Sequence, residues 1–226
     1  MGGALRSLQR LPAVVIMEPE KGAARAPGKA AGSVERSRME AFSDGVLAII
    51  ITIMVLNLKV PEGDTFRDIL SALPPIASYA VSFAYIGAYW NNHHHTLHAV
   101  TMVNGRILWA NLLFLFCISL LPFATEWFSR HLFAPVPTLV YGLVLFSTAI
   151  SFFLLRLALV TQDRNSHALR QVMETDRKGT VTGVVYVIAL GLAMFLPKVS
   201  VALYTGLLLL WFMPERRLET ALSEDR

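Results

Sequence analysis

The chain has 226 residues, of which 54% are hydrophobic and only 16% are charged. Its mean hydropathy of +0.52 is too high for a soluble domain of this size and predicts an integral membrane protein. The net charge of +4 does not indicate a nucleic-acid partner, because the cationic residues lie between apolar segments, where they orient membrane helices. The single cysteine, Cys117, lies inside an apolar run, which excludes a disulfide framework within the chain.

Residues 1–35 are rich in Ala, Gly, Pro and Arg and show no sustained hydrophobic period. This composition predicts a disordered basic tail. The apolar run 11–17 resembles the core of a signal peptide, but Pro12 interrupts it, Glu18 follows it, and it is too short to cross a bilayer. We therefore expect a tail at 1–35, one transmembrane domain at 36–213, and a cytoplasmic C-terminal tail at 214–226.

Six apolar segments within this domain predict an all-α protein with six transmembrane helices. The first contains the run 46–56, which is apolar except for Thr52. The others cover about 76–91, 107–123, 138–160, 180–196 and 199–213. A short amphipathic piece, 65–73, ends at Pro74-Pro75 before the second segment. Only Pro197-Lys198 separates the last two segments, which predicts a tight antiparallel hairpin of two short spans.

The distribution of Lys and Arg predicts the orientation. If the N-terminal tail is cytoplasmic, sixteen of the 20 Lys and Arg residues fall on that side of six alternating spans. The four on the other side are Lys59, Arg67, Arg130 and Lys198. Positive residues concentrate on the cytoplasmic side. We therefore expect a multi-pass protein of the cell membrane with both termini cytoplasmic.

Asp44 lies at the mouth of the first apolar run, where an unpaired carboxylate is costly. The second segment ends in the polar run W-N-N-H-H-H-T-L-H, and Asn111 is the one strongly polar residue inside the third. We expect Trp90, Asn111 and one of the histidines to donate hydrogen bonds to Ser43 or Asp44. The alternative is that Trp and His simply lie at the membrane interface.

The histidine run does not predict a metal site. His94 and His98 have the i, i+4 spacing of two ligands on one helical face. However, neighbouring His93, His94 and His95 point about 100° apart on a helix, and His95 replaces the Glu of the H-E-x-x-H motif. The sequence also contains no nucleophile elbow, phosphate loop or paired carboxylates. We expect no metal, no cofactor and no enzymatic activity.

Ile49, Thr52, Ile53 and Leu56 are spaced at i, i+3, i+4 and i+7, so they form one helical stripe. Periodicity alone favours packing or lipid contact for this stripe. However, R-x-x-x-F-S-D at residues 38–44, followed by G-V-x-A-I-x-I-T, resembles the signature of the transmembrane protein 175 family of potassium channels, in its short prokaryotic form. The segments Y-W-x-x-H-H and N-L-L-F-L-F-x-I-x-L-L-P-F extend this resemblance over about 36–213.

The resemblance implies a six-helix subunit in the lipid bilayer, assembled as a homotetramer around a potassium pore lined by the first helix. In place of a carbonyl filter, it implies a hydrophobic constriction at Ile49, a polar ring at Thr52, and further layers at Ile53 and Leu56. It also implies a structural motif in which the first helix is fixed to its neighbours. The members of this motif are Arg38, Phe42, Ser43 and Asp44, with Trp90, His94 or His95, and Asn111 as partners.

The expected function is a potassium channel with modest selectivity over sodium. One alternative is a proton channel, for which His93 to His95 and Asp44 are the titratable candidates. Another is a proton- or cation-coupled secondary transporter, which we disfavour because the spans carry no convincing ionisable residue near mid-membrane. A non-conducting scaffold also remains an alternative.

Overall fold

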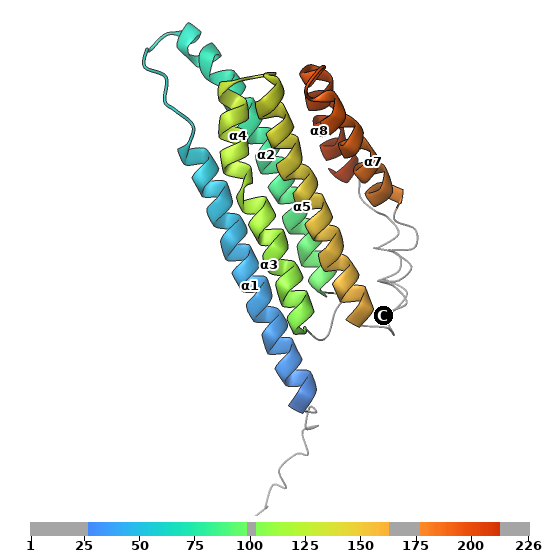
Figure 1. Ribbon diagram of the computed structural model, residues 1–226. Helices are drawn as coiled ribbons and strands as arrows, with labels where there is room; N and C mark the ends of the chain where they lie inside the picture. The colour runs from blue at the N-terminus through green and yellow to red at the C-terminus, as the bar shows by residue number, and fades with distance from the viewer. Residues whose placement is uncertain (1–26, 99–102, 163–176, 213–226) are drawn as a thin grey trace, which may run out of the picture.

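The structure is a computed structural model that describes residues 27–98, 103–162 and 177–212. Within these ranges all regular structure is α-helical, which confirms the predicted fold class. The helices are α1 (Pro27–Leu56), α2 (Phe66–His98), α3 (Gly105–Ser119), α4 (Leu121–Arg130), α5 (Pro135–Gln162), α7 (Arg177–Leu192) and α8 (Pro197–Phe212) (Figure 1). Residues 1–26 and 213–226, which include most of both predicted tails, lie outside the described residues.

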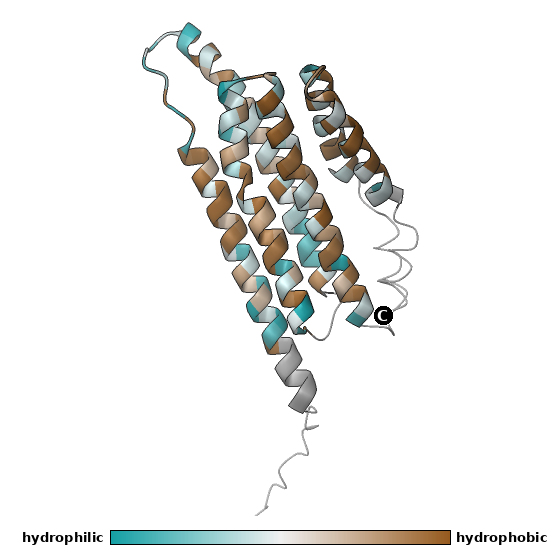
Figure 2. Cartoon of the chain, viewed as in Figure 1, coloured by the Kyte–Doolittle hydropathy of each residue, from teal (hydrophilic) through white to brown (hydrophobic). Residues whose placement is uncertain are grey.

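Four segments are long and apolar enough to cross a membrane: Val34–Leu56, Phe66–Leu97, Gly105–Arg130 and Pro135–Gln162. Helices α7 and α8 have 16 residues each. At 1.5 Å per residue they are about 24 Å long, which is less than the roughly 30 Å of a typical hydrocarbon core. Hydrophobic residues colour most of the length of the helices in Figure 2, and hydrophilic residues gather toward the lower ends of α1, α3 and α5.

The predicted boundary of the N-terminal tail differs from the structure. Helix α1 begins at Pro27, so residues 27–35, which the sequence analysis assigns to a disordered tail, are helical. Pro is well tolerated at a helix start, because the first N–H groups have no intrahelical partner. The first transmembrane helix therefore continues beyond its apolar run at the N-terminal end.

Two predicted boundaries in α2 differ from the structure. The amphipathic piece 65–73 and the span 76–91 form one helix that continues through Pro74-Pro75 to His98. The Asp68 carboxylate accepts the backbone N–H of Thr65 at 3.0 Å, which fixes the start of α2. The Ser78 hydroxyl donates to the Pro74 carbonyl at 3.0 Å, beside the two prolines that interrupt the backbone hydrogen bonds of α2. The polar run that begins at Trp90 is therefore helical, and the helix decides which of its side chains face inward.

The third span is longer than predicted and is divided into α3 and α4. Asn104 caps α3 by accepting the N–H of Ile107 at 3.0 Å. Pro122 has no N–H to bond the Ile118 carbonyl, and the N–H of Leu120 bonds to the carbonyls of Cys117 and Ile118 instead. The helical ladder is interrupted at Leu120 but resumes as α4 and ends at Arg130 rather than near residue 123.

The helices pack into a bundle with α5 near its centre. Helix α5 contacts α3, α4, α7 and α8, whereas α1 contacts α2, α3 and α4 (Figure 1). The turn between α7 and α8 covers residues 193–196, and Pro197 begins α8 instead of separating the two helices. Lys198 Nζ lies 5.8 Å from the centroid of the Phe133 ring. The start of α8 is therefore at the same end of the bundle as the turn between α4 and α5.

Candidate functional site

Helix α1 has one face buried in the bundle and one face left uncovered. The buried face comprises Met39, Ser43, Leu47, Ile50 and Met54, none more than 4% exposed. On the uncovered face, Ile49 is 58% exposed, Ile53 is 45% exposed and Leu56 is 81% exposed. Thr52 is also exposed. The predicted stripe therefore points away from its own subunit and is available to another surface.

The Thr52 hydroxyl donates to the Ile49 carbonyl of its own helix at 2.9 Å. Because its hydrogen is used within the helix, the hydroxyl oxygen keeps acceptor lone pairs on the exposed side. An oxygen in this state can contact a cation. The exposed apolar neighbours of Thr52 can line a channel but cannot coordinate an ion.

A buried cluster that we call the inner clasp ties α1 to α2 and α3. It consists of Ser43, His93 and Asn111, which are at most 2% exposed. Asn111 Nδ2 donates to Ser43 Oγ at 3.0 Å, and Ser43 Oγ donates to the Met39 carbonyl at 2.8 Å. His93 Nε2 lies 2.8 Å from Asn111 Oδ1. Because that amide oxygen can only accept, Nε2 carries the hydrogen in this arrangement.

Asp44 has the partner that the sequence analysis expects. Trp90 Nε1 donates to Asp44 Oδ1 at 3.0 Å. One turn away, His94 Nδ1 lies 2.9 Å from Glu40 Oε1, and the His94 ring stacks on Trp90 with centroids 6.2 Å apart. These contacts add a second polar link between α1 and α2. Two further members of the predicted motif, Arg38 and Phe42, are exposed on α1.

The predicted histidine partner is wrong by one residue. His94 pairs with Glu40 and His95 is exposed, whereas His93, which the predicted motif omits, joins Asn111. The reason is helical phase, since neighbouring side chains on a helix point about 100° apart. A signal was present in the sequence: Leu97, four residues after His93, and Ile86, seven residues before it, are apolar and buried on the same face.

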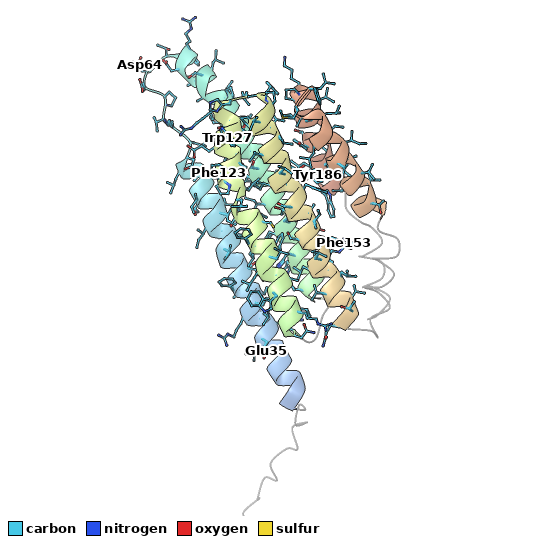
Figure 3. The ribbon with its side chains drawn as sticks, viewed as in Figure 1. Glu35, Asp64, Phe123, Trp127, Phe153 and Tyr186 are labelled. Atoms are coloured by element: carbon cyan, nitrogen blue, oxygen red, sulfur yellow. The ribbon has the colours of Figure 1, made fainter. Side chains whose placement is uncertain are left out.

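The sequence analysis missed a second polar cluster inside the bundle, which we call the hydroxyl cluster. Its members are Ser82, Tyr85, Thr125, Tyr141, Tyr186 and Tyr204, each at most 6% exposed. Figure 3 labels Tyr186 on α7 in the upper half of the bundle, well away from the Glu35 end of α1. The available signal was the run Ser78, Ser82, Tyr85 and Tyr89, whose intervals of four, three and four residues place polar side chains on one face of α2.

Comparison with known proteins establishes the family. Residues 38–122 match the profile of the family described as the endosomal/lysosomal potassium channel TMEM175. A potassium channel of Chryseobacterium sp. (strain P1-3) is 42% identical over 190 residues, which cover 84% of this chain and 99% of that protein. The chain belongs to the TMEM175 family. The resemblance expected from the R-x-x-x-F-S-D motif is thereby confirmed.

Further relatives of this TMEM175 chain include a solved channel. The crystal structure of a lysosomal potassium-selective channel TMEM175 homolog from Chamaesiphon minutus matches with a TM-score of 0.70 and 29% identity, covering 79% of this chain and 96% of that chain. The endosomal/lysosomal proton channel TMEM175 of Gallus gallus is 35% identical over 105 residues, which cover 41% of this chain and 21% of that protein. This TMEM175 chain is thus a multi-pass membrane protein of an ion-channel family and not an enzyme.

Proposed function

We propose that the chain is a potassium channel with modest selectivity over sodium, in which four copies of α1 surround a central pore. The observation that carries this proposal is the uncovered face of α1, where Ile49, Thr52, Ile53 and Leu56 lie exposed on a folded subunit. Relatives that carry the name potassium channel support the choice of ion.

The low burial of the membrane-spanning part of α1 leaves room for contacts with further copies. In Val34–Leu56, 28% of the most apolar 18-residue stretch is buried inside the subunit, and α2, at 17% in Phe66–Leu97, is also largely uncovered. Four copies around an axis would cover the stripe with its own symmetry mates. The Lys and Arg distribution supports a location in the cell membrane with both termini cytoplasmic.

The proposed constriction works through hydration. Four Ile49 side chains around an axis form an apolar throat, which a hydrated cation crosses only when the throat is wide enough to stay wet. Small rotations of α1 then open and close the pore by wetting and dewetting. Potassium releases its water more readily than sodium, and the Thr52 oxygen replaces part of that water. This mechanism gives a modest preference for potassium over sodium without a filter of carbonyl oxygens.

The buried polar contacts of α1 support this arrangement by fixing its rotation. The Ser43–Asn111 and Asp44–Trp90 hydrogen bonds lie one to two turns before Ile49. Because neighbouring side chains point about 100° apart, a slip of one residue would turn a different set of side chains toward the axis. The inner clasp therefore fixes the rotation of α1 about its own axis, and with it the set of side chains that faces the proposed pore.

Flux through reconstituted vesicles tests the proposal. Purified chain in liposomes is expected to release potassium down its gradient and to pass sodium more slowly. Ile49→Asn is expected to wet the throat and raise the sodium leak. Val55→Asn, at an exposed position on α1 outside the stripe, is the matched control and should leave the leak unchanged. Absence of potassium flux overturns the channel, and an Ile49→Asn variant identical to the wild type removes Ile49 from the constriction.

The oligomeric state provides a separate test. Light scattering of the detergent-solubilised protein is expected to give four times the subunit mass of 25.0 kDa, after subtraction of the detergent. A monomer would leave the uncovered face of α1 without a symmetry mate. That result would overturn the central pore and favour a non-conducting scaffold.

A further inference from the structure

The uncovered face of α1 continues inward beyond the stripe that the sequence analysis predicts. Seven exposed residues follow one another along α1 at alternating intervals of three and four: Glu35, Arg38, Phe42, Gly45, Ile49, Thr52 and Leu56. This spacing keeps side chains on one helical face, and it is the spacing by which identical parallel helices pack in coiled coils. At 1.5 Å per residue the face is about 32 Å long. We call this face the long stripe, and it runs the membrane-spanning length of α1.

Two members of the R-x-x-x-F-S-D motif lie on the long stripe and have no role within the subunit. Ser43 and Asp44 of this motif bond to α3 and α2. By contrast, the Phe42 side chain is 54% exposed, and Arg38 forms no ion pair in the described part of the subunit. Glu35, one turn before Arg38, is also exposed and forms no ion pair among the described residues. These side chains are therefore available to a neighbouring copy of the chain.

The charges of Glu35 and Arg38 are complementary between identical copies of α1. Three residues apart on a helix, the two side chains are about 60° apart around the axis and about 4.5 Å apart along it, so they lie on opposite edges of the long stripe. In a ring of parallel copies, each edge faces a different neighbour. Glu35 of one copy then meets Arg38 of the next, and the charges around the ring sum to zero. Figure 3 labels Glu35 on α1 at the opposite end of the bundle from Asp64.

Gly45 lies on the long stripe between two bulky apolar side chains, Phe42 and Ile49. Glycine destabilises a helix interior relative to alanine. A Cβ built on Gly45 would meet nothing within 4 Å, so packing inside the subunit does not require a glycine here. In a ring of four copies, the missing side chain leaves a wide chamber between two narrow apolar rings, and a cation regains water there. The long stripe therefore has the profile of two constrictions rather than one.

We propose that Phe42 forms a second apolar ring on the inner side of Ile49, and that pairs between Glu35 of one copy and Arg38 of the next hold this ring narrow as an inner gate. The inference rests on the proposed channel, because it requires four copies of α1 around one axis. A narrow apolar ring stops ions by dewetting and conducts once it is wide enough to stay wet. Exposed ion pairs are weak one at a time, so the pairs exchange for water when α1 moves. The channel then has two gates in series, one on each side of the chamber.

Potassium flux from proteoliposomes tests the ion pairs. Glu35→Arg and Arg38→Glu each surround the inner mouth with like charges and are expected to raise potassium flux about ten-fold, because the four weak pairs are lost together. Net charge alone would change potassium entry in opposite directions in the two variants, so a rise in both is specific to the pairs. The double variant Glu35→Arg/Arg38→Glu restores opposite charges and is expected to return the flux to the wild-type level. Ser37→Arg, exposed beside these residues but outside the long stripe, is the control and should leave the flux unchanged.

Cross-linking locates Phe42 independently of flux. In a Cys117→Ser background, Phe42→Cys is expected to be joined to a neighbouring copy by a short bifunctional maleimide, which gives a dimer band on a denaturing gel. Ser37→Cys, exposed outside the long stripe, is the control and should stay monomeric on the same gel.

The two experiments separate this inference from the proposed function. The inner gate is overturned if both single reversals match the wild type, if the double variant keeps the high flux, or if Phe42→Cys is not cross-linked in a tetrameric protein. If the single reversals do not fold, the cross-link decides. A wild-type chain that is monomeric or passes no potassium overturns the proposed function, and the inner gate with it.

Discussion

Three adjacent histidines show how strongly one residue of helical phase determines a side chain's role. His93 is buried against Asn111, His94 pairs with Glu40, and His95 is exposed. The residue types predicted that a histidine would join Ser43 and Asn111, because buried polar groups require partners. They could not predict which one, because that depends on where α2 continues past its prolines and which face it turns toward α1 and α3.

The inner clasp should contribute measurably to stability through Asn111. In Asn111→Leu, His93 Nε2 loses its acceptor and Ser43 loses a donor, and leaving a buried polar group unpaired costs about 1–3 kcal/mol. We expect a lower free energy of unfolding, measured by circular dichroism as the detergent-solubilised protein is denatured. Asn91→Leu, at an exposed position, is the control and should unfold with the wild type. Equal stability of the two variants would show that the clasp contributes nothing.

The Thr52 hydroxyl is expected to act on ion preference rather than on folding. Its hydrogen is bonded to Ile49, so Thr52→Ala removes an exposed oxygen without leaving a buried group unpaired. We expect the reversal potential in mixed potassium and sodium to shift toward equal permeability. Val55→Ala, exposed on α1 but outside the stripe, serves as the control. Unchanged reversal potentials in Thr52→Ala would rule out the polar ring.

At the scale of helices, the apolar segments were predictable but several of their ends were not. Apolar length located the membrane-spanning segments, because a membrane segment must satisfy its backbone as a helix, but it did not predict α4 as a separate helix. Prolines caused the errors in α2 and in the third span. Pro74-Pro75 and Pro122 indicate a helix end in a soluble chain, yet α2 continues and α3 is followed directly by α4. Whether a helix continues past a proline depends on neighbouring hydroxyl groups and on packing, which the local sequence does not reveal.

The close approach of α5 and α8 depends on Gly142. A Cβ at this position would meet Tyr204 Oη at 1.9 Å and Leu190 Cδ2 at 3.1 Å, so Gly142→Ala must displace the Tyr204 side chain, either alone or together with α8. Overpacking of this kind typically costs about 1–3 kcal/mol, and we expect the thermal unfolding midpoint to fall accordingly. Gly183→Ala on α7 is the control, since nothing lies within 4 Å of its added Cβ. Equal midpoints would mean that the Tyr204 side chain can move away from residue 142 without a cost in stability.

At the scale of the whole molecule, charge predicts an orientation, which stays a prediction, whereas the residues alone do not predict the assembly. Lys59, Arg67, Arg130 and Lys198 were predicted on one side, and the contact of Lys198 with Phe133 places two of the connecting turns at the same end of the bundle. Assembly depends on how the uncovered face of α1 meets another surface. Periodicity identifies that face but does not distinguish lipid from a symmetry mate.

Labelling of introduced cysteines tests the orientation of the entire bundle. In a Cys117→Ser background, which removes the chain's single cysteine, Lys59→Cys and Lys198→Cys are exposed and should react with a membrane-impermeant maleimide added outside intact cells. Arg106→Cys, exposed at the start of α3, should react only after the membrane is opened. The reverse pattern would place the termini outside.

The interruption at Leu120 divides one transmembrane rod into two stiff pieces. Asn111 belongs to α3, which holds α1 through Ser43, and Thr125 belongs to α4, which carries part of the hydroxyl cluster. The Ala124 N–H still donates to the Leu120 carbonyl at 3.1 Å, so the two pieces remain joined across the turn. Because the ladder is weakest at Leu120, any bending of this span is expected to concentrate there.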